Sequence, residues 1–104
     1  MAILIKATEE KNITISGTEI ELSSVYGRIR FLGDYSGTTI EGEVATFANK
    51  DTFLEGKMLY TDVPIGSYKS ELEAGEPQSL DTAHKYAQIA YEQMGYEVII
   101  DITF

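Results

Sequence analysis

Apolar and polar residues alternate along most of this chain, and glycine, asparagine or serine separates the alternating runs. A period of two places the apolar side chains of a strand on one face, so the pattern predicts short antiparallel strands. Apart from the two hairpins described next, we expect strands over 2–7, 57–63 and 68–73. The strand over 68–73 is the most polar of these, which suits the edge of a sheet.

Residues 12–22 carry the pattern of a β-hairpin. A two-residue loop at Gly17 and Thr18 is typical of a type II′ turn, which takes glycine at its first position. The loop pairs four aliphatic residues on one face, as packing on a core requires. These pairs are Ile15 with Ile20 and Ile13 with Leu22.

A longer hairpin is expected over 25–44, with its turn at 34–37. Centring the turn between its second and third residues creates two ion pairs on the polar face: Arg28 with Glu43, and Arg30 with Glu41. Exposed pairs of this kind contribute about 0.2–1 kcal/mol each and help to fix the register. We therefore assign these four residues a structural role.

Only one segment has helical periodicity, and it spans about Leu80 to Met94, with Ser79 as N-cap and Gly95 after its last turn. Its apolar stripe is expected to face the sheet. The stripe consists of Leu80, Ala83, His84, Ala87, Ala90, Tyr91 and Met94. Ile89 projects from the middle of the polar face and Tyr86 lies at its border. A single exposed aliphatic is ordinary on a soluble protein, but both residues are also candidates for contact with a partner.

A strongly amphipathic strand after Gly95 places five residues on one face: Tyr96, Val98, Ile100, Ile102 and Phe104. Such a strand is either a central member of the sheet or an arm that needs a partner to cover it, and we favour the central position. Ile99, on its other face, is a further candidate interface residue. The whole order predicts a single α+β domain over 1–104, with a mostly antiparallel sheet or partial barrel of about six to seven short strands and one helix (about 80–94) packed on it.

Composition excludes several classes of protein. The 104 residues include no Cys, so a disulfide framework, a thiolate metal site and a thiol nucleophile are impossible. The net charge of -9 opposes nucleic-acid binding, because neutralising phosphates needs clustered Lys and Arg, and the 8 basic residues are scattered. The longest apolar runs fall far short of the roughly 20 residues of a spanning helix, so we expect no membrane insertion.

Catalytic chemistry has little support in the sequence. His84 is the only imidazole, it lies on the stripe expected to face the sheet, and the chain has no Gly-x-Ser-x-Gly elbow. Carboxylates occur in pairs two residues apart, which alternation places on exposed strand faces, whereas glycosidase chemistry needs them in a cleft with one pKa raised by burial. No calcium-loop or phosphate-binding motif occurs. We therefore predict no enzymatic activity, no metal and no cofactor.

Seven tyrosines supply aromatic area, and tyrosine is enriched in protein interfaces. Tyr26 lies on the polar face of its strand with Arg28 and Arg30. It completes the set of candidate interface residues, which are Tyr86, Ile89, Tyr26 and Ile99.

Three parts of the chain resemble a group of small proteins encoded by phages and prophages of gut Bacteroidales. They are Val-Tyr-Gly-Arg-Ile at 25–29, Thr-Asp-Val-Pro at 61–64, and Gln-Ser-Leu at 78–80 leading into Tyr-Glu-Gln-Met-Gly-Tyr-Glu-Val at 91–98. The resemblance implies a virion component, such as a head, neck, tail or baseplate subunit, in the virion or the host cytoplasm. It carries over no functional residue.

These observations favour a non-enzymatic structural or adaptor protein that acts by homo-oligomeric or heteromeric assembly. Two alternatives stay open. One is a monomeric module that holds a peptide or a small apolar ligand between sheet and helix, which requires a cavity. The other is a small acidic inhibitor or nucleic-acid mimic, which requires salt-sensitive binding to a basic partner.

Overall fold

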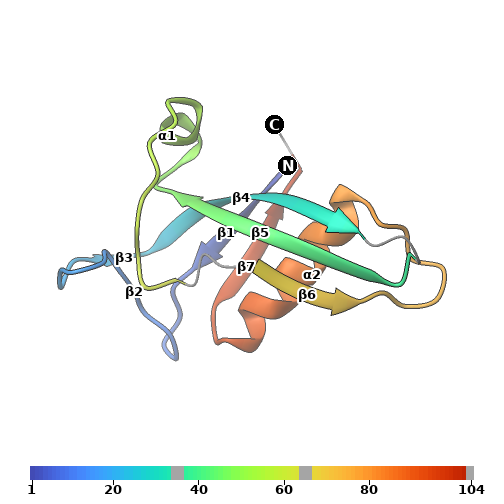
Figure 1. The fold of residues 1–104 in the computed structure, drawn as a ribbon. Coiled ribbons are helices and arrows are strands. Elements are labelled where there is room, and N and C mark those ends of the chain that lie inside the picture. Colours follow the sequence, from blue (N-terminus) through green and yellow to red (C-terminus); the bar gives the residue numbers. More distant parts are fainter. Residues whose placement is uncertain (34–36, 64–66, 103–104) are drawn as a thin grey trace.

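The computed structural model describes residues 1–33, 37–63 and 67–102. The elements along the chain are β1 (Ala2–Lys6), β2 (Ile13–Thr14), β3 (Glu21–Leu22), β4 (Ser24–Gly33), β5 (Thr39–Phe47), α1 (Lys50–Leu54), β6 (Ser67–Glu71), α2 (Leu80–Gln93) and β7 (Glu97–Asp101) (Figure 1).

Five antiparallel strands form the main sheet in the order β6-β5-β4-β1-β7, and β2 with β3 forms a separate two-stranded sheet. The main sheet curves into half a barrel, and α2 lies across one face of it (Figure 1). The predicted α+β class, with one main helix and a final strand, is confirmed. The chain passes from the edge strand β6 through α2 to the opposite edge strand β7.

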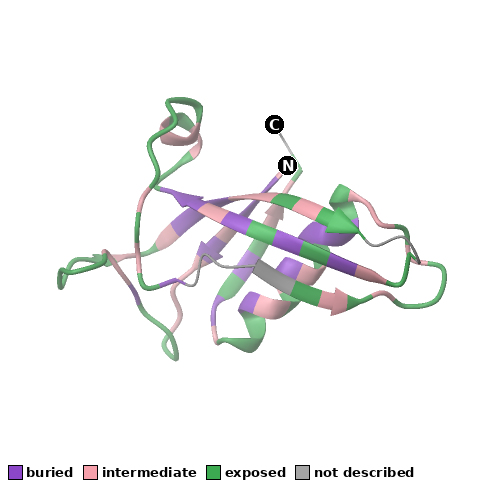
Figure 2. Ribbon diagram, viewed as in Figure 1, coloured by how far each residue is buried: buried purple, intermediate pink, exposed green. Residues whose placement is uncertain are grey.

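Buried and exposed residues alternate along the middle of β5, as Figure 2 shows, so one face of this strand packs on the core. The main core lies between the sheet and α2. Its buried members are Ile3, Ile5, Ile13, Val25, Val44, Val63, Ala87, Tyr91, Tyr96 and Val98. A smaller cluster of Ala2, Tyr26 and Phe47 forms on the opposite face, where Phe53 of α1 packs against it.

The helix α2 has the predicted ends. The Ser79 hydroxyl accepts a hydrogen bond from the Thr82 N–H, and Gly95 takes a φ of +105°, which suits a residue without a Cβ. The predicted stripe is buried in its middle at Ala83, His84, Ala87 and Tyr91, but Leu80 and Met94 at its two ends are exposed. Thr82, which lies outside the predicted stripe, is also buried, and its hydroxyl is hydrogen-bonded to that of Ser79 at the N-terminal cap.

The first hairpin has the predicted register, but its turn differs from the prediction. The Thr18 N–H donates to the carbonyl of Ile15, so Ser16 and Gly17 are the central residues of the turn, in place of Gly17 and Thr18. The predicted apolar face is only partly buried, because the side chain of Ile20 is 57% exposed. This end of the hairpin reaches beyond the core that covers its base.

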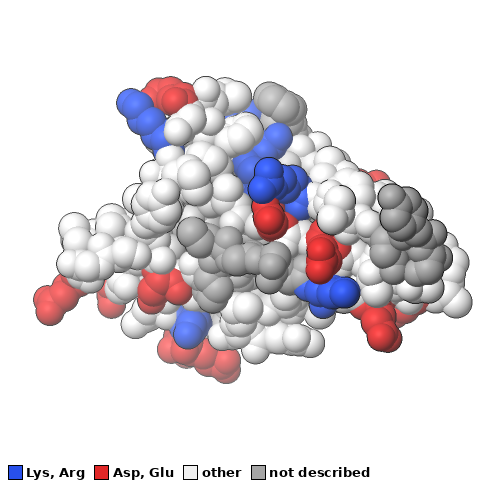
Figure 3. All heavy atoms as spheres, in the orientation of Figure 1, with Lys and Arg blue, Asp and Glu red and all other residues white. Residues whose placement is uncertain are grey.

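The second hairpin is shifted by two residues from the predicted register. Arg30 lies opposite Glu43, and Arg28 lies opposite Ala45. A shift of two keeps every side chain on its predicted face, so alternation alone does not detect it. The middle of the predicted turn lies outside the described residues. Arg30 and Glu43 form an ion pair of 2.5 Å on the face of the sheet away from α2, where Figure 3 shows acidic and basic side chains side by side.

Three other expectations about the elements were wrong. The segment 57–63 forms only an isolated bridge, between Thr61 and Ile15, where a whole strand was predicted. The short helix α1 was not predicted; it begins at a capping box formed by Asn49 and Thr52. Finally, β7 is an edge strand rather than a central one, because β1 is its only neighbour among the strands of the described residues. Phe104, predicted to continue β7, lies outside the described residues.

Candidate functional site

The outer edge of β7 is the candidate site. The hydrogen bonds of β1 show which backbone groups of β7 point away from the sheet. The Ala7 N–H donates to the Ser23 carbonyl, so the odd-numbered residues of β1 face β4 and the even-numbered ones face β7. The partners of these even-numbered residues on β7 are Glu97, Ile99 and Asp101. The backbone groups of the intervening residues, Val98 and Ile100, therefore point away from the sheet.

One acceptor on this edge is already bonded within the chain. The side-chain Nε2 of Gln88, on the neighbouring flank of α2, donates to the Val98 carbonyl over 3.0 Å. Within the described part of the chain, no hydrogen bond joins the N–H or the carbonyl of Ile100. A strand edge with free donors and acceptors is a template for a further strand. Gln88 covers one end of that template.

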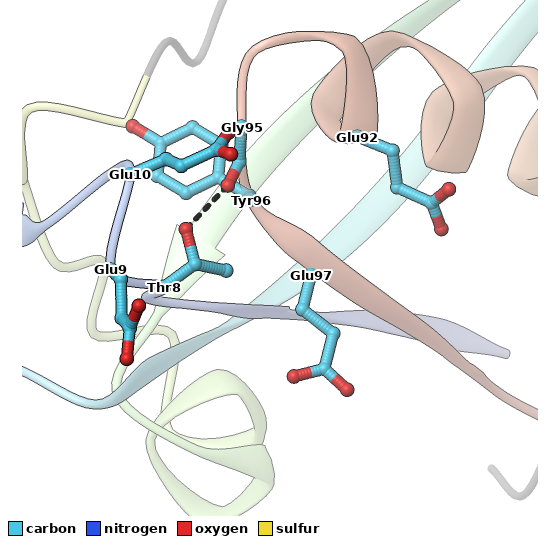
Figure 4. A pocket seen from close by; sticks show the side chains of 7 residues that line it. All are labelled: Thr8, Glu9, Glu10, Glu92, Gly95, Tyr96 and Glu97. Atoms are coloured by element: carbon cyan, nitrogen blue, oxygen red, sulfur yellow. Dashed lines mark hydrogen bonds between the residues drawn. The ribbon is translucent and has the colours of Figure 1, made fainter.

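A shallow groove of about 660 Å³ lies at the beginning of β7. It is lined by Thr8, Glu9, Glu10, Glu92, Gly95, Tyr96 and Glu97. Figure 4 shows Glu9 and Glu10 coming from the loop after β1, and Glu92 and Glu97 projecting from α2 and β7. The Thr8 hydroxyl donates to the Gly95 carbonyl over 2.6 Å and so ties the loop to the end of the helix. The groove thus gathers four carboxylates beside the strand edge.

Tyr96, which lines this groove, packs against a second buried tyrosine, Tyr91. Tyr96 is 3% exposed, and its ring centroid lies 6.3 Å from that of Tyr91. Burial, and to a smaller extent the charge of Asp62, raises the pKa of Tyr96, and burial raises the pKa of Tyr91 to about 12. Both phenols therefore stay neutral at physiological pH. The Tyr96 hydroxyl has no hydrogen-bond partner among the described residues, although it is buried.

Two of the predicted interface residues are at the surface. Ile99 on β7 and Ile89 on α2 are each 40% exposed. Ile99 lies on the face of the sheet away from α2, whereas Ile89 follows Gln88 on the outer side of the helix. The structure therefore does not bring them into one patch.

The other two predicted interface residues are engaged within the chain. Tyr86 is half-buried, and its hydroxyl donates to Glu76, a contact that raises the pKa of Tyr86. Tyr26 is only 3% exposed, since Phe53 of α1 lies 6.0 Å away between ring centroids and the Arg28 side chain donates to the Tyr26 hydroxyl. The unpredicted helix α1 is the reason that the Tyr26 ring is covered.

His84 is fully buried in the helix–sheet interface. Its Nδ1 lies 2.7 Å from the Leu80 carbonyl, which accepts a hydrogen bond if Nδ1 carries the proton. Its Nε2 has no partner among the described residues. No group of three His, Cys, Asp or Glu side chains placed to hold a metal ion occurs in 1–33, 37–63 or 67–102.

Sequence reasoning found Ile89 and Ile99 but missed the strand edge and the groove. Glu9 and Glu10 adjoin each other in the chain, yet Glu92 and Glu97 join them only because the β1 loop packs against the end of α2. The bond from Gln88 to Val98 likewise depends on the position of β7 at the edge. No local sequence pattern predicts either arrangement.

Comparison with models of protein families, with curated proteins and with solved structures found no match to this chain. Of the helices in the described ranges, none is long and apolar enough to cross a membrane. The resemblance to phage-encoded proteins stays a prediction.

Proposed function

We propose that this chain is a non-enzymatic structural or adaptor protein that joins other protein subunits by strand pairing at the outer edge of β7. A phage particle, as a head, neck, tail or baseplate subunit, is the setting that the sequence resemblance implies. The observation that carries the proposal is the free backbone of Ile100 on an edge strand whose neighbouring side chain, Ile99, is left 40% exposed. Backbone pairing supplies affinity at such an edge, and the side chains beside it supply specificity.

Ile100→Pro tests this proposal directly. Proline removes the outward N–H of Ile100 but not the bonds that β7 makes to β1, and an edge strand tolerates proline at such a position. Ile100→Ala is the matched control, because it loses the same half-buried side chain and keeps the N–H. Amide spectra of both variants establish first that they are folded.

The readout is the amide spectrum of the labelled protein during titration with a neutral strand-forming peptide of alternating Val and Thr. We expect shifts confined to β7 in the wild type and in Ile100→Ala, and their loss in Ile100→Pro. Light scattering over a concentration series reports in parallel whether the chain pairs with itself. Shifts spread over other elements, or equal in all three proteins, contradict the proposal.

A further inference from the structure

We infer that the partner of the β7 edge is a basic extended segment of another protein, and not a second copy of this chain. The inference rests on the function proposed above and identifies the chemistry of its partner. It is drawn from the charges that surround the edge and from the register that strand pairing imposes.

Carboxylates flank the edge on both sides. Glu97 and Asp101 lie on β7 itself, on the same face as Ile99, and Glu92 lies on the neighbouring flank of α2. Glu9 and Glu10 extend the acidic surface beyond the beginning of the strand.

Lys6 and Lys11 lie beside the carboxylates at the beginning of β7 and offset part of their charge. Lys6 is opposite Glu97 on β1, and the Nζ of Lys11 is 6.0 Å from the centroid of the Tyr96 ring. The potential at the edge is therefore negative. Since the chain as a whole carries a net charge of -9, a cationic partner is attracted at long range as well.

Strand pairing with a second copy brings like charges together. An antiparallel pair that uses the outward groups of both Val98 and Ile100 places Val98 of each copy opposite Ile100 of the other. Glu97 of each copy then lies opposite Asp101 of the other copy. Directly opposed like charges destabilise a strand pair.

The same register defines the partner that fits. A segment of about five residues with Lys or Arg at its first and fifth positions faces Asp101 and Glu97, and an apolar residue at its third position covers Ile99. One of its backbone N–H groups replaces the Gln88 side chain at the Val98 carbonyl. The partner is thus an alternating strand with basic ends, contributed by another protein.

Three capped peptides test the inference: Thr-Lys-Thr-Val-Thr-Lys-Thr, the same peptide with Gln in place of both Lys, and the same peptide with Glu. Binding is followed through the amide shifts of Val98 and Ile100 at low and at high salt. We expect the Lys peptide to bind about tenfold more tightly than the Gln peptide at low salt, as two half-exposed ion pairs allow. The Glu peptide should bind most weakly, and high salt should reduce the differences.

Charge variants show whether the preference arises at this edge. Glu92→Gln with Glu97→Gln should reduce the preference for the Lys peptide from about tenfold to about threefold, because Asp101 still faces the second Lys. Glu19→Gln with Glu71→Gln is the matched control, because it removes the same charge far from β7 and should preserve the preference.

The outcomes separate this inference from the proposed function. Equal binding of the Lys and Gln peptides at β7, or a discrete oligomer of the chain alone that is lost in Ile100→Pro, overturns the basic partner and leaves strand pairing at β7 intact. Shifts away from β7 with every peptide, or no binding of any peptide together with a monomer at all concentrations, overturn both.

Discussion

At the scale of a single residue, Gly27 is a point of close packing between neighbouring strands of the sheet. It lies in β4 opposite Ile3 of β1 and Thr46 of β5, and the Val44 side chain of β5 reaches toward it from the next position along the same face. A Cβ at this position would lie 2.9 Å from Cγ1 of Ile3 and 3.2 Å from Cγ1 of Val44. Both neighbours are buried, so neither moves aside without disturbing the core. The absence of a side chain at Gly27 allows these two aliphatic residues to approach each other.

Gly27→Ala is therefore expected to destabilise the protein by about 1–3 kcal/mol, although alanine restricts the unfolded chain more than glycine does. Urea unfolding measures the change. In the Ile3→Ala background the same substitution should cost much less, because the crowding atom is gone. Additive effects of the two substitutions would refute this account of Gly27.

Particular residues show most clearly which features of the structure could be predicted from the sequence. Ser79 and Gly95 mark the ends of α2 through local chemistry, and both were identified correctly. Ile89 and Ile99 are exposed as their periodicities predicted. Tyr26 is covered because a helix distant in sequence packs over it, and alternation in its own strand contains no information about that helix.

At the scale of elements, the segment between β6 and α2 is held against the helix by Glu76. Its carboxylate accepts hydrogen bonds from the Tyr86 hydroxyl, from Lys85 over 2.8 Å, and from the Glu73 N–H over 2.8 Å. Lys85, then Tyr86 and the Glu73 N–H, lower the pKa of Glu76 to about 2. This pKa is below the value of 4.5 expected in the unfolded chain, so the ionised carboxylate stabilises the fold.

The sign of this effect gives a pH dependence. The stabilisation is complete above pH 4.5 and is lost as the pH falls toward 2. Glu76→Gln should therefore lower the urea midpoint at neutral pH and differ less from the wild type as the pH approaches 2. Glu71→Gln makes the same charge change on the exposed strand β6 and should show little effect. A constant difference between Glu76→Gln and the wild type over this range would argue against the contacts described.

Element positions were harder to predict than element types. Alternation identified the strands of both hairpins, and it fixed which residues share a face. It did not fix the register of the second hairpin, since a shift of two residues preserves all faces. Nor did it place β7, because an edge strand packed on one face and a central strand show the same alternation. The strand edge, and with it the candidate site, depends on the order of the strands in space.

At the scale of the whole molecule, the half-barrel leaves two strand edges, at β6 and β7. Gln88 occupies the Val98 carbonyl at the second edge, as natural proteins often cover an edge with a side chain or a charge. The net charge of -9 keeps copies of the chain apart in addition. The Gln88 hydrogen bond and the negative charge of the chain therefore both oppose strand pairing between copies.

Gln88→Leu should weaken this protection, because leucine keeps the size of the side chain but donates no hydrogen bond. We expect the variant to associate more than the wild type as concentration rises, mainly at high salt, where charge repulsion is screened. Light scattering provides the measurement. Gln93→Leu, an equal change at an exposed position of α2, is the control, and equal association of the two variants would contradict the role given to Gln88.

The ladder between β1 and β7 joins the first strand of the chain to the last, and this has a consequence for the folding reaction. Contacts between residues so distant in sequence form slowly, because a long loop must close before the ladder gains any bonds. Until then β1 exposes the edge that carries Ala2 and Leu4, which is far more apolar than the acidic edge of β7. We therefore expect β7 to dock late in folding, and its docking to replace an apolar strand edge with an acidic one.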